Sequence, residues 1–482
     1  MKNDGKDVQS MLGDPRSAIR RMILPFLISI VTIQINIFAD TFWVSGLGIE
    51  AVSGMTTAVP IYSIFTNIAV GLSVGVVATI AYRIGKRDLE SASDIAGNAI
   101  VTGIALSIAC SLAVFLLMDP IVDLMGAQDV RQQVSDYTMP FILMSPLVVL
   151  NTIFGGLLRA EGSARRSTIV QMSAAVFNMI LDPILIYELD LGLAGAGLAT
   201  TIAAGMGLMI GIHWYLRKDT AIGISRKNLR LKRDAEKDLM NVAGPRTVEG
   251  LTMTVVILFQ RVFIIMASGT PGVSLFNVPF RYVTLSMCPS EATGMAMVPV
   301  ASASYGQSDV EKMSEAMMYA LKVAIAISVA MMVILFVFSE PLITMFTLEP
   351  SMEEWKEAFV WNMRVYCLIL PFFTIQTIGS SMLQSMKRSK RPMEVTMIVG
   401  VIRMLLFWLC SAYDYQAITY ALIASYVISA AMMAFFAKME FDKIKGKISK
   451  GAAAVRSGHD GALSHPEADG IGCPCHVPII RT

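Results

Sequence analysis

The sequence predicts an all-α membrane protein in which twelve transmembrane helices form two parallel six-helix repeats, an N-lobe and a C-lobe, around a central cavity. Three observations lead to this prediction: long apolar runs, a one-sided distribution of positive charge, and an internal repeat. Of the 482 residues, 55% are hydrophobic and 16% are charged, whereas soluble domains carry about 25% charged residues. We therefore expect a polytopic membrane protein that lies in the lipid bilayer and binds a small drug-like substrate and no nucleic acid.

Twelve apolar runs are long enough to cross a membrane, since a helix needs about 20 residues to span roughly 30 Å of hydrocarbon. We place them at residues 22–44, 51–80, 92–118, 134–158, 167–187, 193–216, 239–268, 272–300, 313–338, 357–383, 393–412 and 416–437. Arg20 and Arg21 precede the first run, as basic residues do in a signal peptide. That run continues to about Val44 without a small-residue cleavage site, so we interpret it as a retained helix.

Lysine and arginine residues lie almost entirely on one side of these spans. When the connecting segments are assigned alternately to the two sides, one side carries 31 of these residues and the other only Arg131 and Lys356. Positive residues accumulate on the cytoplasmic side of membrane proteins. The sequence therefore predicts a multi-pass protein of the cell membrane with both termini in the cytoplasm.

The two halves of the chain repeat each other. Five matches occur in the same order and at a nearly constant offset: Pro25 with Pro245, Gly85-Lys-Arg-Asp88 with Gly306-Gln-Ser-Asp309, Met118-Asp-Pro-Ile121 with Ser339-Glu-Pro-Leu342, Pro146 with Pro371, and Leu158-Arg159 with Leu383-Gln384. Because six spans is an even number, both halves enter the membrane from the same side. They are expected to be parallel repeats with the substrate between them.

These observations divide the chain into five parts: a cytoplasmic N-terminal segment (1–21), the N-lobe with helices 1–6 (22–216), a basic cytoplasmic linker (217–238), the C-lobe with helices 7–12 (239–440), and a cytoplasmic tail (441–482). After about Lys450 the composition contains too little apolar surface to fold, so we expect the tail to be disordered. Cys473, Cys475 and His476 are poorly spaced for zinc, and we expect no transition-metal site and no cofactor.

A few polar residues lie inside apolar spans of the N-lobe: Gln34, Asn36 and Asp40 in the first span, Asn178 and Asp182 in the fifth, and Thr200 in the sixth. A charged side chain at the centre of a membrane helix costs roughly 2.5–3.5 kcal/mol on insertion scales, so such residues usually have a function. Asn178 and Asp182 are four residues apart and share a helix face, as do Asn36 and Asp40.

The same cluster has no counterpart in the second half, because the repeat places Arg403 and Phe407 opposite Asn178 and Asp182. At roughly 1.5 Å per residue, Asp40, Asp182 and Thr200 lie about 7–11 Å below the outer boundary. Hard oxygen ligands suit Na⁺ or a proton. We interpret Asp40, Asp182, Asn178 and Thr200 as a cation site, with Gln34 and Asn36 as a supporting polar network.

Several motifs make the chain resemble the multidrug and toxic compound extrusion (MATE) family, and within it the prokaryotic DinF-like branch. They are Ala39-Asp-Thr-Phe-Trp-Val-Ser-Gly-Leu-Gly48, Gly85-Lys-Arg-Asp88, Leu158-Arg-Ala-Glu-Gly162, Asn178-Met-Ile-Leu-Asp-Pro183 and Gly195-Ala-Gly-Leu-Ala-Thr200. The resemblance covers about residues 20–440. It implies two six-helix bundles around a V-shaped cavity, and drug efflux driven by inward Na⁺ or H⁺.

The resemblance also assigns residues. The N-lobe cation site of that branch carries over to Asp40, Asp182, Asn178 and Thr200, and an early glutamine of the family falls on Gln34. The family's other large branch has acidic residues in its seventh and tenth helices, for which this chain offers no central equivalent. Its cation site is therefore not expected here.

Two further motifs have more than one interpretation. Pro25 breaks a backbone hydrogen bond inside the first span, which is compatible with a static kink or with a moving hinge. Gly71-Leu-Ser-Val-Gly75 matches the nucleophile motif of serine hydrolases, but it lies inside an apolar span with no strand before it. Close helix packing through small residues explains it better.

The leading functional hypothesis is a secondary antiporter, acting as a monomer, that exports amphipathic, cationic organic compounds in exchange for Na⁺ or H⁺, and that is not an enzyme. A lipid-linked precursor flippase of the same superfamily, holding phosphate with Arg261 and Arg403, is the alternative. A major-facilitator transporter would need a Gly/Asp/Arg-rich signature that Tyr82–Asp88 lacks. A membrane enzyme would need a catalytic constellation at membrane depth, and the sequence has none.

Overall fold

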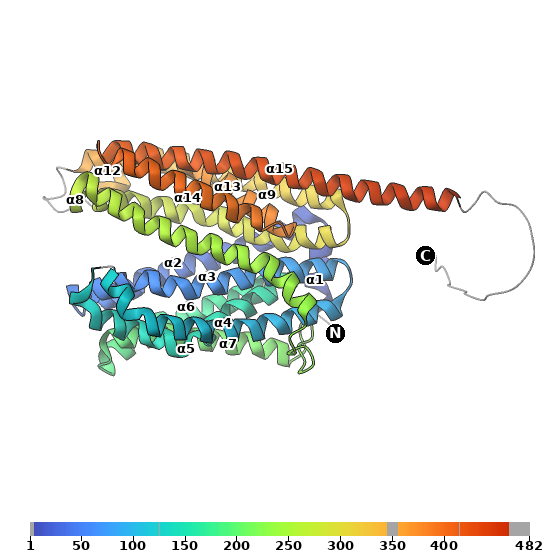
Figure 1. Cartoon of the computed structure of the whole chain (residues 1–482), viewed down its shortest axis with the longest axis horizontal. Coiled ribbons are helices and arrows are strands. Elements are labelled where there is room, and N and C mark those ends of the chain that lie inside the picture. The colour runs from blue at the N-terminus through green and yellow to red at the C-terminus, as the bar shows by residue number, and fades with distance from the viewer. Residues whose placement is uncertain (1–3, 125, 345–354, 414, 462–482) are drawn as a thin grey trace, which may run out of the picture. The chain divides into compact units, whose positions relative to one another are not determined.

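The computed structural model describes residues 4–124, 126–344, 355–413 and 415–461, and every regular element in these ranges is helical (Figure 1). The chain forms two compact units, Met1–Glu440 and Phe441–Thr482. The first unit contains the helices predicted to cross the membrane. This confirms the all-α fold class for the described part of the chain.

The N-lobe consists of the helices from α2 to α7. Their bounds are α2 (Pro15–Ser45), α3 (Ile49–Gly85), α4 (Leu89–Leu124), the 3₁₀ turn η1 (Gln128–Val130), α5 (Arg131–Ala160), α6 (Ala164–Pro183), the π-helical turn η2 (Ile184–Glu188) and α7 (Gly192–Leu216). A short helix, α1 (Asp4–Leu12), precedes them. Helix α2 starts before the predicted span because the Asp14 carboxylate caps it, accepting a 2.9 Å hydrogen bond from the Ser17 amide, and because Pro15 suits the first helical position.

The C-lobe repeats this arrangement with the elements α8 (Arg233–Gly306), α9 (Val310–Val337), α10 (Ser339–Thr344), α12 (Lys356–Tyr366), α13 (Ile369–Ser385), α14 (Lys390–Cys410) and α15 (Tyr415–Gly461). Helix α8 has two arms that meet at Gly269, whose φ of 64° and ψ of −163° are accessible to glycine but not to other residues. The two arms correspond to the predicted spans at 239–268 and 272–300. Helices α12 and α13 together form the predicted span at 357–383.

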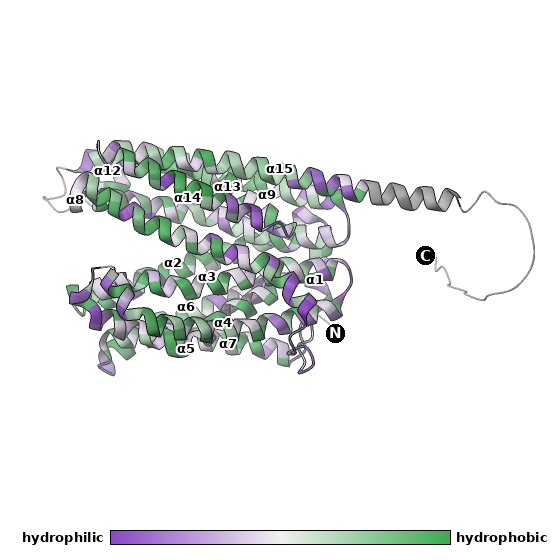
Figure 2. Cartoon of the chain, viewed as in Figure 1, coloured by the Kyte–Doolittle hydropathy of each residue, from purple (hydrophilic) through white to green (hydrophobic). Residues whose placement is uncertain are grey.

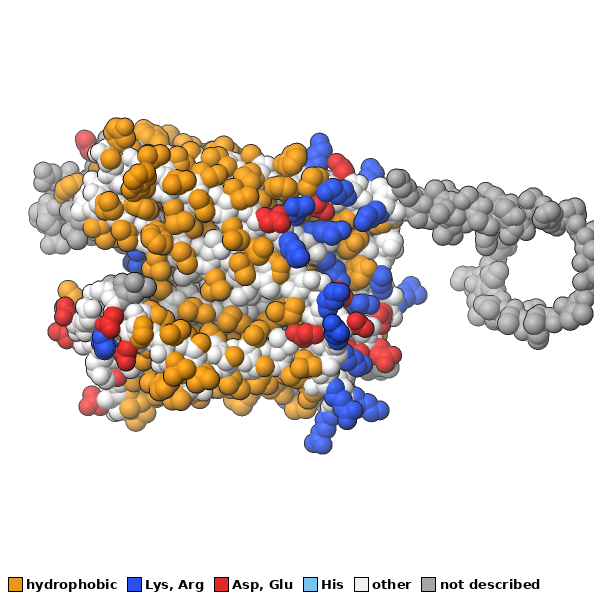
Figure 3. Space-filling view, viewed as in Figure 1, with side chains coloured by type: hydrophobic (Ala, Val, Ile, Leu, Met, Phe, Trp, Pro, Cys, Tyr) orange, Lys and Arg blue, Asp and Glu red, His pale blue; other side chains and the backbone are white. Residues whose placement is uncertain are grey.

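All twelve predicted spans are helical. Eleven helical segments in the described ranges are long and apolar enough to cross a membrane, and the second arm of α8 supplies the remaining predicted span. Apolar residues cover the middle of the first unit (Figure 2), whereas Lys and Arg gather at one end of it (Figure 3). We call this the basic end; it includes the loops at 86–88, 161–163, 217–232, 307–309 and 386–389.

The lobes meet along α3 and α8, where glycines allow close approach. A Cβ added to Gly71 would lie 2.0 Å from Thr247 Oγ1, and one added to Gly75 would lie 2.8 Å from Ala243 Cβ. The Gly71–Gly75 motif is therefore a packing motif of the interface between the lobes, which confirms the structural interpretation of this motif over the catalytic one.

The second unit, in its described part, is the last portion of α15, which continues to Gly461. This corrects the prediction that the chain is disordered from residue 441. Phe441, Ile444 and Ile448 recur at helical spacing, which favours continuation of the helix. Residues 462–482, with Cys473, Cys475 and His476, lie outside the described residues.

Candidate functional site

The polar residues predicted to form a cation site come together in the N-lobe. Asn178 on α6 is the centre of the group. Its side-chain amide donates to Asp182 Oδ1 at 2.9 Å and to Thr200 Oγ1 on α7 at 3.4 Å. Its Oδ1 accepts a hydrogen bond from Asn36 Nδ2 on α2 at 2.8 Å. Three helices thus contribute to one hydrogen-bonded group, which we call the acidic cluster, with Asp40 as its fifth member.

Asp40 lies one turn after Asn36 on α2 and belongs to the same cluster. The Tyr137 hydroxyl, on α5, donates to Asp40 Oδ2 at 3.4 Å. The two carboxylates, Asp40 and Asp182, are close enough to interact electrostatically. Tyr137 was not among the predicted residues, because a single tyrosine in an apolar span belongs to no motif that would single it out.

The cluster contains more acceptor oxygens than donors. Asp182 is fully buried and Asp40 is 9% exposed. Three of the buried oxygens have no hydrogen-bond donor among the residues that the structure describes: Asn36 Oδ1, Asp40 Oδ1 and Asp182 Oδ2. Buried acceptors without a partner are costly. A set of carboxylate and amide oxygens of this kind fits Na⁺ or a proton.

The backbone next to the acidic cluster departs from a regular α-helix, and this irregular segment connects the helices that carry the cluster. Pro183 has no N–H to donate, and the chain continues from it into the π-helical turn η2. The start of α7 packs closely on this turn, since a Cβ on Gly195 would lie 2.6 Å from the Leu185 carbonyl oxygen. The Tyr187 hydroxyl in turn donates to the Trp43 carbonyl at the end of α2. The turn therefore links the ends of α2, α6 and α7 beside the cluster.

Gln34 does not join the acidic cluster. It lies six residues before Asp40, which turns it about 120° away around a helix with 3.6 residues per turn. Its side chain interacts with Cys288 on the second arm of α8 instead. The predicted supporting network thus includes Asn36 but not Gln34. Pro25 lies within α2, which passes through it without a break.

A cavity of about 670 Å³ lies between the two lobes. Residues of α2, α3, α5 and α6 line it on one side, and residues of α8, α13 and α14 on the other. Neither Asp40 nor Asp182 is among the lining residues. Helix α2 contributes Ser29 and Ile33 to the cavity wall and, one to two turns further on, Asn36 and Asp40 to the acidic cluster. Helix α6 does the same, with Gln171 in the cavity wall and Asn178 and Asp182 in the cluster, so both helices connect the two sites.

The cavity wall carries four ionisable side chains, namely Arg159, Arg246, Glu249 and Glu291. The arginines that the flippase hypothesis requires lie elsewhere. Arg403 donates to Ser425 Oγ at 2.9 Å and lies over the Tyr426 ring, and neither it nor Arg261 lines the cavity.

Two six-helix lobes with a polar cavity between them, and a buried ionisable cluster within one lobe, define a membrane transporter. The chain belongs to the MatE family, the MATE transporters, whose family model matches residues 25–184 and 245–409. The two matched stretches begin at Pro25 and Pro245, which are equivalent positions of the internal repeat. As a member of this family the protein is a multidrug-export type of transporter and not an enzyme. Its assignment to the DinF-like branch stays a prediction.

Three comparisons illustrate the relationship. The chain is 25% identical over 374 residues to the FAD transporter of Shewanella oneidensis, covering 76% of this chain and 80% of that protein. It is 23% identical to the multidrug export protein MepA of Staphylococcus saprophyticus, covering 71% and 76%. A solved MOP superfamily transporter from Pyrococcus furiosus matches with a TM-score of 0.87 and 26% identity, covering 92% of this chain and all of that chain.

Proposed function

We propose that this protein is a secondary antiporter that exports amphipathic, cationic organic compounds through the central cavity in exchange for Na⁺ or H⁺. We further propose that it resides in the cell membrane with the basic end in the cytoplasm, and that one chain suffices, because a single chain supplies the whole cluster and cavity. The observation that carries the coupling proposal is the set of three buried oxygens without donors in the acidic cluster.

The cluster can couple cation binding to a change in α2. When Asp40 and Asp182 are both charged, their repulsion and their desolvation oppose close approach of α2 and α6. A bound Na⁺ or proton reduces both the repulsion and the cost of desolvation, so that α2 and α6 can approach each other. Because α2 also lines the cavity through Ser29 and Ile33, a shift or a bend at Pro25 would change the cavity wall.

The driving force is sufficient for uphill export. Each elementary charge that moves inward contributes about 2.3 kcal/mol per 100 mV of membrane potential. Export of a monovalent cationic compound moves one charge outward, so two inward cations leave one net inward charge, which supports a concentration ratio of roughly tenfold or more. Exchange for one inward cation is electroneutral and is driven by the Na⁺ or pH gradient alone. Asp40 and Asp182 together provide room for one or two protons or for one Na⁺.

Alternating access requires that the cavity close toward the cytoplasm while it is open outward. At the basic end, Asp238 on α8 accepts from Arg83 of the N-lobe at 2.9 Å and from Lys387 of the C-lobe. The rings of Tyr82 and Tyr305 pack beside this group, with centroids 5.1 Å apart. These contacts support an outward-facing state with the basic end closed.

Transport in proteoliposomes, with the Na⁺ and pH gradients imposed separately, tests the proposal. We expect the wild-type protein to move ethidium under one of the two gradients. Asp40→Asn and Asp182→Asn should each reduce this movement at least tenfold, whereas Asp129→Asn, an exposed carboxylate in η1, should leave it unchanged. Full activity of both cluster variants would refute the coupling role. Absence of gradient-driven transport by the wild type would refute the antiporter.

A further inference from the structure

The four ionisable side chains of the cavity differ in whether hydrogen bonds or ion pairs offset their charges. Arg246 and Glu249 form an ion pair at 3.7 Å, and Glu249 also accepts from the Ser380 hydroxyl at 3.4 Å. Arg159 donates to Ser73 Oγ at 2.6 Å and is held in the wall between α3 and α5. In the described part of the chain, Glu291 forms neither a hydrogen bond nor an ion pair, and only the more distant charge of Arg246 acts on it.

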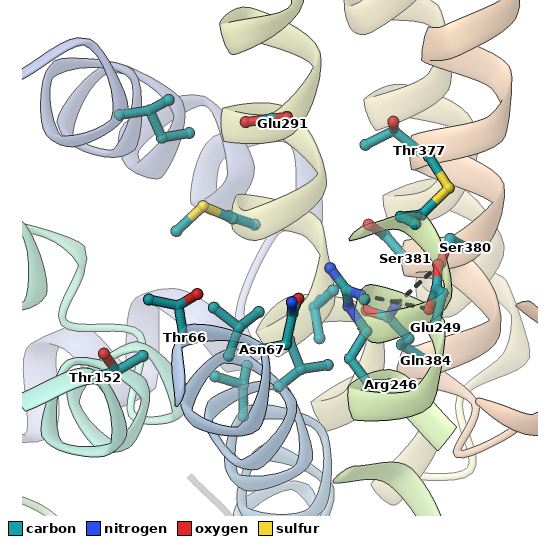
Figure 4. A pocket seen from close by; sticks show the side chains of 18 of the residues that line it. Thr66, Asn67, Thr152, Arg246, Glu249, Glu291, Thr377, Ser380, Ser381 and Gln384 are labelled. Carbon is teal, nitrogen blue, oxygen red and sulfur yellow. Dashed lines mark hydrogen bonds and ion pairs between the residues drawn. The ribbon is translucent and has the colours of Figure 1, made fainter. Parts of the chain in front are cut away.

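Glu291 faces the cavity from the second arm of α8. Glu291, Met295 and Val298 follow one another at helical spacing and all line the cavity, so they share the helix face that forms its wall. The Glu291 side chain is exposed, and this exposed surface belongs to the cavity. Figure 4 shows it apart from the bonded group of Arg246, Glu249 and Ser380.

The cavity wall that contains Glu291 has apolar as well as polar side chains. Ile33, Val70, Met295 and Phe373 are among the residues that line the same cavity. A carboxylate without a counter-ion in such a wall attracts a cation more strongly than it would in water, because the effective dielectric constant is lower. The apolar wall favours aromatic or aliphatic groups attached to that cation, and Phe373 can add a cation–π contact.

We propose that Glu291 is the residue that selects cationic substrates, by placing its carboxylate against the ammonium or phosphonium centre of an amphipathic compound in the central cavity. This proposal rests on the proposed export function and deepens it. It separates two tasks: Glu291 recognises the charge of the substrate, whereas the acidic cluster binds the coupling cation. Substrate and coupling cation then communicate through α2 and α6, the helices that line the cavity and carry the cluster, and do not compete for one carboxylate.

The test is the binding of two isosteric ions of opposite charge, tetraphenylphosphonium and tetraphenylborate, to the purified protein. Isothermal titration calorimetry in detergent, with empty micelles subtracted, measures each Kd without any ion gradient. We expect Glu291→Gln to weaken tetraphenylphosphonium binding about tenfold or more and to leave tetraphenylborate binding unchanged or stronger. Glu291→Asp should restore most of the affinity for the cation, and Glu291→Lys should reverse the preference between the two ions.

Three comparisons keep the result interpretable. Asp129→Asn, which removes an exposed carboxylate that is not among the cavity-lining residues, should bind both ions like the wild type. Asp182→Asn should lose gradient-driven transport but still prefer tetraphenylphosphonium to tetraphenylborate, because Glu291 is unchanged. An unchanged Kd for tetraphenylphosphonium in a correctly folded Glu291→Gln protein would overturn the proposal, as would an equal loss for both ions. Failure of the antiport proposal would show separately, as an absence of gradient-driven transport in the wild-type protein.

Discussion

Gly85 of α3 and Gly306 of α8 pack against each other at the basic end, and they are equivalent positions of the internal repeat. A Cβ on Gly85 would lie 2.1 Å from the Ala303 carbonyl oxygen, and one on Gly306 would lie 2.1 Å from the Tyr82 carbonyl oxygen. Backbone meets backbone here, so a larger residue cannot be accommodated by rotating a side chain. The contact joins the two lobes at the end where these two central helices terminate.

Replacement of either glycine should open this contact. We expect Gly85→Val and Gly306→Val to shift the protein away from the state with the basic end closed and to reduce transport at least tenfold. The measurement is the labelling rate of a cysteine placed in the cavity, as in Gln376→Cys, by a membrane-impermeant maleimide applied from the basic side. Gly223→Ala is the matched control, because a Cβ there meets nothing within 4 Å. Unchanged labelling in both valine variants would contradict the role of this contact.

Asp238 should stabilise the same closed state electrostatically, since it joins Arg83 to Lys387. Asp238→Asn removes a charge shared by two cations, and we expect faster labelling of the cavity cysteine from the basic side by about tenfold. Asp234→Asn, an exposed carboxylate one turn earlier in α8, should leave the rate unchanged. If the cavity cysteine is labelled as slowly in the Asp238→Asn variant as in the protein that keeps Asp238, the glycine contact closes the basic end without help from Asp238.

Asn178 should determine the affinity for the coupling cation, because it alone donates to Asp182 in the described cluster. Asn178→Ala removes this donor and the link to Asn36. Loss of such a buried hydrogen bond costs about 1–3 kcal/mol, so we expect the concentration of Na⁺ or H⁺ that half-activates transport to shift about tenfold. Asn228→Ala removes a hydrogen-bonded asparagine of the loop at the basic end and should cause no such shift. A half-activating concentration equal to that of the wild type would argue against Asn178 as part of the site.

Glu161, in the turn after α5, should make stability depend on pH. Burial raises the pKa of Glu161 from its ordinary value of 4.5 to about 7, against the opposing effect of hydrogen bonds from the Ala221 and Ile222 amides and the Tyr215 hydroxyl. Between pH 4.5 and 7 the folded protein keeps a proton that the unfolded chain releases. The free energy of unfolding therefore falls as the pH rises through this window, by on the order of 3 kcal/mol.

Glu161→Gln should remove this dependence while it keeps an acceptor for the linker amides. Thermal unfolding midpoints measured at pH 5 and pH 8 test the prediction. We expect the wild-type midpoint to fall further between the two values than the midpoint of the variant. Equal changes in the two proteins would mean that other groups determine the pH dependence.

Much of the candidate site follows from local sequence. Asp40, Asn178, Asp182 and Thr200 are conspicuous because polar residues are rare in apolar spans, and the structure joins them in one cluster. Asn36 was recognised by its spacing of four residues from Asp40. Gln34 shows the limit of this reasoning, because it is just as polar and just as deep but projects from another face of α2 toward the C-lobe.

The sequence by itself determined which segments are helical, how many cross the membrane and how the two halves correspond, because hydrophobic length and repeated motifs are properties of neighbouring residues. Only the tertiary structure decided that Tyr137 reaches Asp40, that α2 connects the acidic cluster to the cavity, and that Glu249 has an ion-pair partner among the described residues while Glu291 has none there. Those relations depend on which helix faces meet across the two lobes. A pattern along one chain does not specify that choice, since many packings bury the same apolar surface equally well.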